Sequence, residues 1–508
     1  MNLAAALFAN ARQKKFIDIP ALLYHDESIS YAALDRLSNQ AANLLDNLDV
    51  HSGERVLILL RDTPELIALF LGAVKAGVVP VVLSTRISRE DVGHALGDSE
   101  AVAIFVEADL ASLTEDAGGS GTSVHERSEF VARLNRADET FEPILRERDD
   151  TAFWVCSSGS TSRPKSVVHT HGGVTAANGF HREQLLLHAG TRIHCTSKLS
   201  FAYPLSNTFL GAMDVGASVV LYPDWHDPES LLQTIEHHSP EVVFSTPTLY
   251  RRVLHAATDG KRDLLGKVRA WVSAGEHLSE GVNDAWRAFT GNDILDCYGT
   301  SETLFLITAT PLDARRPDSA GRAVPGAELQ LRGPGGDALP PGKIGELYVR
   351  HPFLANGYAN NPELTEQRFS GGWFATGDLF LYDTDGFWYF RGREDSRIKI
   401  AGQWVHLQDV ENAVSEDRSV KEVAAVSAPD EDGLSRIALF VVCEPGAPQT
   451  QVADNVHQRL LQLPTHKRPR WLQFADALPR TNTGKIKRHE LRPLVAMHAD
   501  QDSVNSAD

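Results

Sequence analysis

The sequence has few cysteines, four among 508 residues, and they lie far apart: Cys156, Cys195, Cys297 and Cys443. None is part of a Cys-x-x-Cys pair, and their spacing does not fit a zinc site. A disulfide framework and a structural zinc centre are therefore excluded as organising features. Isolated thiols are typical of a reducing compartment, so the sequence predicts a cytoplasmic protein.

Positive charge and long apolar runs are also scarce. The chain has 49 Lys and Arg against 67 Asp and Glu, a formal net charge of −18 at pH 7. Nucleic acid and anionic membrane surfaces require a basic face, so both are disfavoured as partners. No stretch approaches the roughly 18 apolar residues that span a bilayer. The apolar start from Leu3 to Ala9 precedes its charged residues, the reverse of a secretory signal.

One candidate group of basic residues lies near the C-terminus and is made of His466, Lys467, Arg468, Arg470, Arg480, Lys485, Lys487 and Arg488. Such a group is usually a solvated surface. An anionic cofactor would nevertheless need a local positive patch on so acidic a protein. We therefore keep this group as a candidate docking surface for a cofactor phosphate or an acidic partner.

The pattern of apolar residues predicts an α/β fold. Ser30 can cap a helix with apolar residues at helical spacing, and buried strands are expected at 56–60 and 78–83 with a helix between them. This alternation predicts mainly parallel sheets flanked by helices. From about 320, short segments between Gly/Pro turns predict a small β-rich subdomain. The polar tail, 498–508, is expected to be disordered.

One short loop indicates phosphate binding. Residues 157–165 read Ser-Ser-Gly-Ser-Thr-Ser-Arg-Pro-Lys and follow an apolar segment. Small hydroxyl residues and one glycine let backbone N–H groups surround phosphate oxygens, and Lys165 adds a positive charge. The loop is not a P-loop, because Pro164 stands where the second glycine belongs and proline has no N–H to donate. Alone, such a run is most often an ordinary loop.

Further stretches follow in a fixed order. In 296–303, Tyr298 can stack on a purine, Asp296 can accept from an amine and Glu302 offers an oxygen ligand for Mg²⁺. Asp378 ends the tight turn Thr-Gly-Asp and can accept from ribose hydroxyls. Each of these stretches alone could be a simple turn. The remaining two are Gly-Arg-Glu-Asp at 392–395 and Pro-Arg-Thr-Asn-Thr-Gly-Lys at 479–485.

Together these motifs resemble the adenylate-forming superfamily, which includes acyl- and aryl-CoA synthetases, peptide-synthetase adenylation domains and firefly luciferases. The resemblance extends over essentially the whole chain. Ser166 departs from the glycine that usually follows the loop lysine, and His406-Leu407 departs from the Ser-Pro of many aryl ligases.

The resemblance implies a role for each matching residue. Lys485, Lys165 and Glu302 would be catalytic, and Glu302 with Thr161 would bind magnesium. The residues expected to bind the nucleotide or the thiol cofactor are Ser157, Ser158, Gly159, Ser160, Thr161, Gly275, Glu276, Asp296, Tyr298, Gly299, Thr300, Asp378, Arg393 and Gly402.

The resemblance also implies the domain organisation. It predicts an N-terminal domain over 1–394 with two α/β subdomains and the β-rich subdomain, and a mobile α+β C-terminal domain over 395–497. Asp395 would be the hinge between them. In the family, the C-terminal domain rotates about this hinge once the adenylate has formed. The rotation withdraws from the active site the lysine that matches Lys485.

The segment 198–204 resembles the acyl-pocket segment of benzoate-type CoA ligases. Phe201, Ala202, Tyr203 and Phe305 are expected to form a flat apolar slot for an aromatic ring. Equally, these aromatic residues could be plain core. Pro204 replaces the usual glycine of this segment.

The leading hypothesis is an ATP-dependent aryl-CoA ligase of the benzoate or hydroxybenzoate type, with ATP, Mg²⁺ and CoA as cofactors. A second hypothesis is an aryl-adenylating ligase that loads a phosphopantetheinyl carrier protein, and a third is a non-catalytic nucleotide sensor. Luciferase chemistry stays open. The expected partners are an aromatic acid and CoA, with a monomer or homodimer as the oligomeric state.

Overall fold

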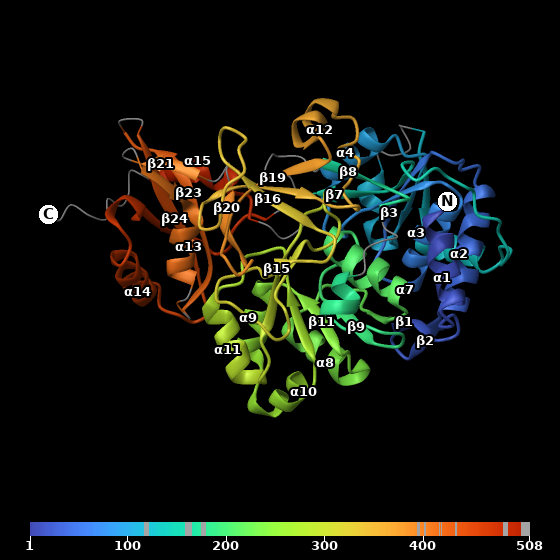
Figure 1. Cartoon of the computed structure of the whole chain (residues 1–508), viewed down its shortest axis with the longest axis horizontal. Helices are drawn as coiled ribbons and strands as arrows, with labels where there is room; N and C mark the ends of the chain where they lie inside the picture. Colours follow the sequence, from blue (N-terminus) through green and yellow to red (C-terminus); the bar gives the residue numbers. More distant parts are fainter. Residues whose placement is uncertain are drawn as a thin grey trace. The chain divides into compact units, whose positions relative to one another are not determined.

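The computed structural model describes residues 1–115, 121–157, 165–173, 179–393, 397–400, 403–415, 417, 419–431, 434–480 and 486–498 (Figure 1). The chain divides into two compact units. Unit 1 comprises Met1–Gln330, Tyr348–Thr376 and Tyr382–Tyr389, and unit 2 comprises Leu331–Leu347, Gly377–Leu381 and Phe390–Asp508. The predicted boundary at Asp395 lies outside the described residues and stays a prediction.

A six-stranded sheet in unit 1 has the order β6-β5-β3-β4-β7-β8, parallel except for the antiparallel pair β7-β8. Its strands are β3 (Arg55–Leu59), β4 (Val79–Val82), β5 (Ala103–Val106), β6 (Ser123–Glu126), β7 (Thr151–Ser157) and β8 (Lys165–Thr170). The helices in this part of the chain are α1 (Leu3–Gln13), α2 (Tyr31–Asp46), α3 (Pro64–Lys75), α4 (Arg89–Ser99), the 3₁₀ helix η1 (Ala108–Thr114) and α5 (Arg127–Leu134).

Both faces of this sheet are covered. Along β3, Val56 and Ile58 pack in the large core with α2 and α3, whereas Leu57 and Leu59 pack in a second core with α4. This alternation is what a strand buried on both faces requires. The predicted α/β arrangement of sheets flanked by helices is confirmed.

A nine-stranded sheet in unit 1 has the order β15-β14-β13-β12-β11-β9-β10-β1-β2. Its strands are β1 (Pro20–Tyr24), β2 (Glu27–Ser30), β9 (Arg192–Cys195), β10 (Ser218–Leu221), β11 (Val242–Ser245), β12 (Ala270–Ser273), β13 (Ile294–Tyr298), β14 (Thr308–Ala309) and β15 (Arg322–Ala323). The helical segments are η3 (Phe180–Gln184), α6 (Ala202–Pro204), η4 (Leu205–Leu210), α7 (Gly211–Val215), α8 (Pro228–His238), α9 (Pro247–Ala256), η5 (Asp259–Lys261), α10 (Arg262–Gly266) and α11 (Glu280–Thr290). The strands from β9 to β13 pair in parallel, so their carboxyl ends share one edge.

A five-stranded sheet has the order β16-β17-β19-β18, with β20 beside β19. Its elements are β16 (Glu328–Arg332), β17 (Gly345–Arg350), α12 (Pro362–Arg368), β18 (Phe369–Ser370), β19 (Trp373–Tyr382) and β20 (Trp388–Arg393).

The C-terminal part of unit 2 contains β21 (Arg397–Ile400), β22 (Gln403–His406), α13 (Leu407–Ser415), β23 (Val420–Pro429), β24 (Ser435–Cys443), α14 (Gln449–Leu461), η7 (Thr465–Lys467), β25 (Trp471–Phe474) and α15 (Arg488–His498). Along β24, Leu439 and Val441 pack in a core with α13 and α14, and Phe440 packs in a core with α15. The predicted small α+β character is what this part of the chain has. No helix within the described ranges is long and apolar enough to cross a bilayer.

Candidate active site

The two strands that flank the predicted phosphate loop form a hairpin. Ser157, at the end of β7, lies opposite Lys165, at the start of β8. The Ser157 hydroxyl donates a hydrogen bond to the Lys165 carbonyl at 3.3 Å. The hairpin therefore fixes both ends of the loop. The predicted phosphate ligands Ser158, Gly159, Ser160 and Thr161 lie outside the described residues.

A segment near residue 357 runs beside β8 and brings a tyrosine to the hairpin. The Val168 N–H donates to the Gly357 carbonyl at 3.0 Å, and the Asn356 N–H donates to the Val168 carbonyl at 2.8 Å. Gly357 has φ +117°, and a Cβ at this position would overlap the Thr365 side chain. Only glycine fits there. A bridge between Val167 of β8 and Tyr358 completes the pairing.

Tyr358 links two of the predicted catalytic residues. The Lys165 ammonium lies over its ring, with Nζ 5.7 Å from the ring centroid, within the ~6 Å reach of a cation–π contact. Its hydroxyl donates to Glu302 Oε1 at 2.7 Å. Cation, ring and carboxylate thus form a continuous row. Tyr358 was not predicted as a site residue, because its sequence surroundings offer little more than the turn dipeptide Asn356-Gly357 before it.

The backbone around Glu302 is held by hydrogen bonds from two directions. The Ala355 N–H donates to the Glu302 carbonyl at 2.8 Å, and His169 Nε2 lies 3.0 Å from the Ser301 carbonyl. Burial lowers the pKa of His169 to about 4, so its ring is neutral at pH 7 and Nε2–H is the donor. The His169 ring also stacks on Phe153 of β7. The Glu302 carboxylate is therefore presented by a fixed backbone.

The donor set around Glu302 fits a magnesium ion that arrives with nucleotide phosphates. No group of three or more His, Cys, Asp or Glu that could hold a metal occurs in the described part of the chain. Magnesium is usually held by one or two carboxylates together with substrate phosphates and water. A single carboxylate near the phosphate hairpin meets that requirement.

The predicted adenine-binding segments follow two neighbouring parallel strands. Ser273 of β12 lies opposite Asp296 of β13, so the segments that leave these strands share one edge of the sheet. Ligands of open α/β sheets bind at the carboxyl ends of strands. Gly275 has φ +87°. A Cβ on Gly299 would come within 2.9 Å of the Phe305 carbonyl, so glycine is required for that close approach.

The two carboxyl groups in these segments have different surroundings. Burial raises the pKa of Asp296 well above its usual range, and Asp318 adds to the shift. Glu276 instead accepts from the N–H and the hydroxyl of Thr248, at 3.2 and 2.7 Å. In this structure Glu276 therefore caps the start of α9.

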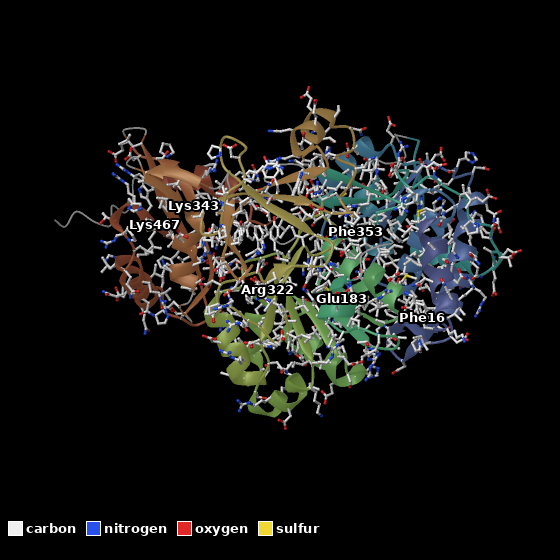
Figure 2. All side chains as sticks on the ribbon, viewed as in Figure 1. Phe16, Glu183, Arg322, Lys343, Phe353 and Lys467 are labelled. Carbon is white, nitrogen blue, oxygen red and sulfur yellow. The ribbon has the colours of Figure 1, made fainter. Side chains whose placement is uncertain are left out.

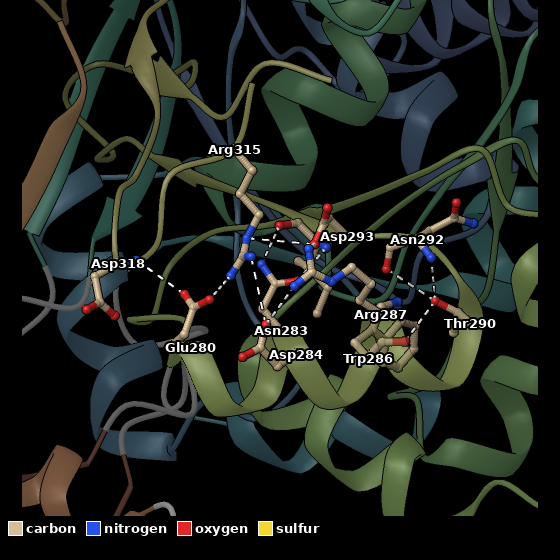
Figure 3. Close-up of polar contacts among 11 residues, drawn as sticks. Glu280, Asn283, Asp284, Trp286, Arg287, Thr290, Asn292, Asp293, Arg315 and Asp318 are labelled. Atoms are coloured by element: carbon tan, nitrogen blue, oxygen red, sulfur yellow. Dashed lines mark hydrogen bonds and ion pairs between the residues drawn. The ribbon is translucent and has the colours of Figure 1, made fainter. Parts of the chain in front are cut away.

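A charged network fixes the loop beside Asp296 (Figure 3). Arg315 donates to Glu280, and its guanidinium lies 3.7 Å from Asp293 and 3.9 Å from Asp284. These contacts fasten the loop after β14 to helix α11. Asp296, Glu280 and Arg315 are among the residues that line a cavity of about 10 Å³, room for about one water molecule. The network thus supports the segment that is predicted to bind adenine.

The aromatic rings predicted to form the acyl pocket pack against different partners. Phe201 contacts Trp225 with ring centroids 6.1 Å apart, and Tyr203 contacts Phe244 at 5.9 Å. Phe305 is buried and contacts Phe353, labelled in Figure 2, at 5.3 Å. Phe305 is thus part of the large core and Tyr203 packs against it, whereas Phe201 is half-buried.

Hydrogen bonds nevertheless tie these pocket residues together. The Ser206 hydroxyl donates to the Leu304 carbonyl at 2.7 Å. The Asn207 amide donates to the Tyr203 carbonyl at 3.0 Å. The loop that carries Phe305 is thereby fixed to the helical segment that carries Ala202 and Tyr203. Part of that segment, η4, is π-helical, a feature that is frequent at functional sites.

Unit 2 brings together the two residues predicted to contact ribose or phosphate. Arg393 Nε lies 3.5 Å from Asp378 Oδ1. The Gly377 N–H before Asp378 donates to Glu346 Oε1 at 3.0 Å, and Gly377 has φ +74°. Asp378 lies within strand β19, so the tight turn that the sequence predicted at 376–378 is wrong. The strand is irregular there, because Gly377 is in the left-handed region, and the Glu346 carboxylate fixes its backbone N–H.

The basic group near the C-terminus is largely neutralised within unit 2. Lys467, labelled in Figure 2, lies 2.6 Å from Asp409, and Arg488 contacts Glu411 at 2.8 Å. Arg470, Arg480 and Lys487 have acidic partners as well, namely Asp430, Glu422 and Glu490. These five basic residues of the group are therefore paired with carboxylates. Lys485, Asp395 and Gly402 lie outside the described residues, and their roles stay predictions.

Two family models match the chain. The model described as AMP-binding enzyme matches residues 7–359, and the model described as AMP-binding enzyme C-terminal domain matches residues 409–485. Together they include the hairpin, Glu302 and Tyr358 in the first match and the region before Ile486 in the second.

Curated relatives are similar over nearly their whole length. A 3-hydroxybenzoate–CoA ligase from Aromatoleum sp. (strain CIB) is 36% identical over 516 residues, covering 97% of this chain and 97% of the relative. A 3-hydroxybenzoate–CoA/4-hydroxybenzoate–CoA ligase from Thauera aromatica is 34% identical over 513 residues, with the same coverage of 97% of each chain.

Solved structures agree with this similarity. The anthranilate CoA ligase AuaEII in complex with anthranoyl-AMP superposes with a TM-score of 0.90 at 29% identity, covering 98% of both chains. A benzoate CoA ligase from Burkholderia xenovorans LB400 superposes with a TM-score of 0.87 at 31% identity, covering 97% of this chain and 100% of that one.

Proposed function

This chain belongs to the AMP-binding enzyme family, and from that premise we propose that it is an ATP-dependent aryl-CoA ligase of the benzoate or hydroxybenzoate type. It activates an aromatic carboxylic acid to aryl-AMP and transfers the aryl group to CoA. The observation that carries the proposal is the row of Lys165, Tyr358 and Glu302 beside the phosphate hairpin. The names of the full-length relatives support the aromatic substrate and the CoA acceptor.

The chemistry explains why ATP is needed. A carboxylate is a poor acyl donor, because its leaving group would be oxide. When a carboxylate oxygen attacks the α-phosphorus of ATP, the α–β phosphate bond breaks and pyrophosphate leaves with its electron pair. The acyl carbon then carries AMP as a good leaving group. The CoA sulfur displaces AMP, the thiol proton is lost and the thioester forms.

Catalysis of the first step consists mainly of positioning and charge stabilisation. Lys165 places an ammonium group at the end of the phosphate loop, and Tyr358 orients the Glu302 carboxylate. A unit charge at about 4 Å and an effective dielectric of about 20 contributes about 4 kcal/mol, or roughly a thousandfold in rate. Glu302 would hold magnesium, which when bound neutralises phosphate charge.

We also propose roles for the remaining site residues. Asp296, Tyr298, Gly299, Thr300, Gly275 and Glu276 would line the adenine, a role supported by their common edge of the sheet. Asp378 and Arg393 would contact ribose, a role supported by their contact in unit 2. Lys485 would reach the nucleotide during adenylation, with Asp395 as hinge and Gly402 near the thiol.

The acceptor has one competing candidate, the phosphopantetheine of a carrier protein. Yields of aryl thioester with free CoA and with a holo carrier protein distinguish the two. The basic group near the C-terminus does not distinguish the two, because a CoA phosphate and an acidic carrier would both use its positive charge; the names of the full-length relatives support CoA. The four free cysteines support a cytoplasmic location.

The test is a pyrophosphate-release screen with benzoate, hydroxybenzoates, anthranilate, cinnamate and short fatty acids, each with and without CoA. We expect release that depends on an aromatic acid, and an aryl-CoA product when CoA is present. Release with fatty acids alone would contradict the aromatic substrate. No acid-dependent release from the folded protein would favour a nucleotide sensor.

A further inference from the structure

Two charged residues that the proposed reaction does not use are buried together beside the acyl-pocket segment. Asp62 is 7% exposed and Lys198 is 5% exposed. The Lys198 ammonium lies 3.9 Å from Asp62 Oδ2. Burying two charges is expensive unless they are paired and hydrogen-bonded. A pair in such a place therefore calls for a function.

The pair joins the carboxyl ends of strands from two sheets. Asp62 follows β3 of the six-stranded sheet and precedes helix α3, whereas Lys198 follows β9 of the nine-stranded sheet. Both residues belong to unit 1. Ligands of α/β sheets bind at the carboxyl ends of strands, which is where both residues lie.

Hydrogen bonds hold this part of the chain through the backbone of Leu199 and through the side chain of Lys198. The Leu199 N–H donates to both carboxylate oxygens of Asp62, at 3.2 and 3.3 Å. The Lys198 ammonium donates to the Tyr222 carbonyl at 2.7 Å. The segment that carries Phe201, Ala202 and Tyr203 begins two residues after Leu199. Its starting point is thus set by Asp62 and Lys198.

Two neighbouring histidines add no charge to this region. His194 Nδ1 lies 2.9 Å from the Val220 carbonyl, so this nitrogen must carry the proton. His194 Nε2 then accepts from His226 Nε2–H at 2.9 Å. Burial lowers the pKa of His194 to about 3 and that of His226 well below its usual range. Both rings are neutral, and Asp62 is the carboxylate that faces Lys198 at 3.9 Å.

We infer that Asp62 and Lys198 are positioning residues for substrate recognition: they fix the segment 199–203 so that its rings meet the aromatic acid. This inference rests on the proposed function. A second buried pair, Lys75 with Asp35, has the same chemistry but joins α3 to α2 and supports no pocket residue. A variant of this second pair therefore shows what the loss of a buried ion pair does to stability alone, without an effect on the segment 199–203.

The experiment uses the full chain with Asp62→Asn, Lys198→Met and the double variant, and Lys75→Met as matched control. Amide hydrogen exchange of the peptide 198–205 is measured first, since it does not require activity. We expect exchange about tenfold faster in Asp62→Asn, in line with the loss of a hydrogen bond to a charged group. The control should leave this peptide at the wild-type rate.

Kinetics then report recognition. In Asp62→Asn and Lys198→Met, KM for the aromatic acid should rise about tenfold, while KM for ATP stays within about twofold. If one single variant does not fold, the double variant, which leaves no unpaired buried charge, gives the same two readouts.

Unchanged exchange in the peptide 198–205, or an equal change in Lys75→Met, would overturn the inference. A parallel rise in KM for ATP would also overturn it. An inactive wild-type enzyme would count against the proposed function alone, because the exchange measurement still decides whether Asp62 and Lys198 fix the segment.

Discussion

At the scale of single residues, the candidate catalytic residues could be predicted from the sequence more readily than the residue that holds them in place. Lys165 and Glu302 stand out because each carries a charge within an unusual motif. Tyr358 does not, because its partners lie 56 and 193 residues away in the sequence. A tyrosine after a turn dipeptide has many possible roles, and only the pairing with β8 shows which one it has.

Tyr358 gives a direct prediction. Tyr358→Phe removes the hydroxyl that donates to Glu302. A hydrogen bond to a charged group is worth about 1.5–3 kcal/mol, so pyrophosphate release should slow about 10- to 100-fold. Binding of magnesium with a non-hydrolysable ATP analogue, measured by calorimetry, should weaken as well.

The matched control is Tyr389→Phe, which removes a similar bond to Asp383 at 2.8 Å. This variant should keep the wild-type rate and affinity. If both variants behave alike, the row of Lys165, Tyr358 and Glu302 has no special role in nucleotide binding.

The buried pair makes substrate recognition sensitive to pH. Burial raises the pKa of Asp62 to about 6, opposed by Lys198 and the Leu199 N–H. Above this pH the carboxylate is ionised and holds the segment, and below it the protonated carboxyl no longer balances Lys198. KM for the aromatic acid should therefore rise as the pH falls through about 6.

Other groups near the pair do not share this titration. The pKa of the Cys195 thiol is raised to about 12. His194 and His226 stay neutral, and Lys198 also interacts with the charges of Asp224 and Arg86. In Asp62→Asn the rise near pH 6 should disappear, with KM high throughout. Persistence of the rise in Asp62→Asn would assign it to another group.

At the scale of elements, regular helices and strands follow from local pattern. Ser30 accepts from the Ala33 N–H and starts α2, as its capping position predicts. Strand β3 and helix α3 fall where the apolar pattern places them. The π-helical segment η4 could not be predicted, because its side chains hydrogen-bond to the distant loop at 304–306.

Close packing in this region gives a prediction about stability. A Cβ on Gly211 would overlap the His181 ring, which hydrogen-bonds the Asn207 carbonyl and contacts Phe305. Gly211→Ala should therefore lower the free energy of unfolding by about 1–3 kcal/mol. Urea denaturation measures this change.

Gly97→Ala in α4 is the matched control, since nothing lies within 4 Å of its added Cβ. Alanine in a helix is favoured over glycine by up to about 1 kcal/mol, so this variant should be neutral or more stable. Equal destabilisation by the two changes would show that packing against His181 is not the cause.

At the scale of the whole molecule, the fold class follows from the order of motifs and the alternation of helix and strand. The family resemblance assigns both Asp378 and Arg393 to the nucleotide, and the two residues meet within one unit. The basic group could not be interpreted in the same way, because its acidic partners Asp409 and Glu411 lie 58 and 77 residues earlier.

The family resemblance predicts that Lys485 is needed to form aryl-AMP but not to transfer the aryl group to the thiol. Lys485→Ala should slow aryl-AMP formation roughly a thousandfold, the value of one well-placed charge. Thioester formation from supplied aryl-AMP should change little. Lys487→Ala is the control, because its ammonium pairs with Glu490 at 2.9 Å, and both half-reactions should survive. If Lys485→Ala slowed both half-reactions equally, the prediction that Lys485 acts only in aryl-AMP formation would be contradicted.

The central claim is that this protein makes a mixed anhydride between an aromatic acid and AMP. Exchange of labelled pyrophosphate into ATP, measured without CoA, tests it most directly, because label enters ATP only by reversal of that step. The account predicts exchange that requires benzoate or a hydroxybenzoate together with Mg²⁺. Exchange that proceeds equally well without any acid, or none with any aromatic acid, would contradict it.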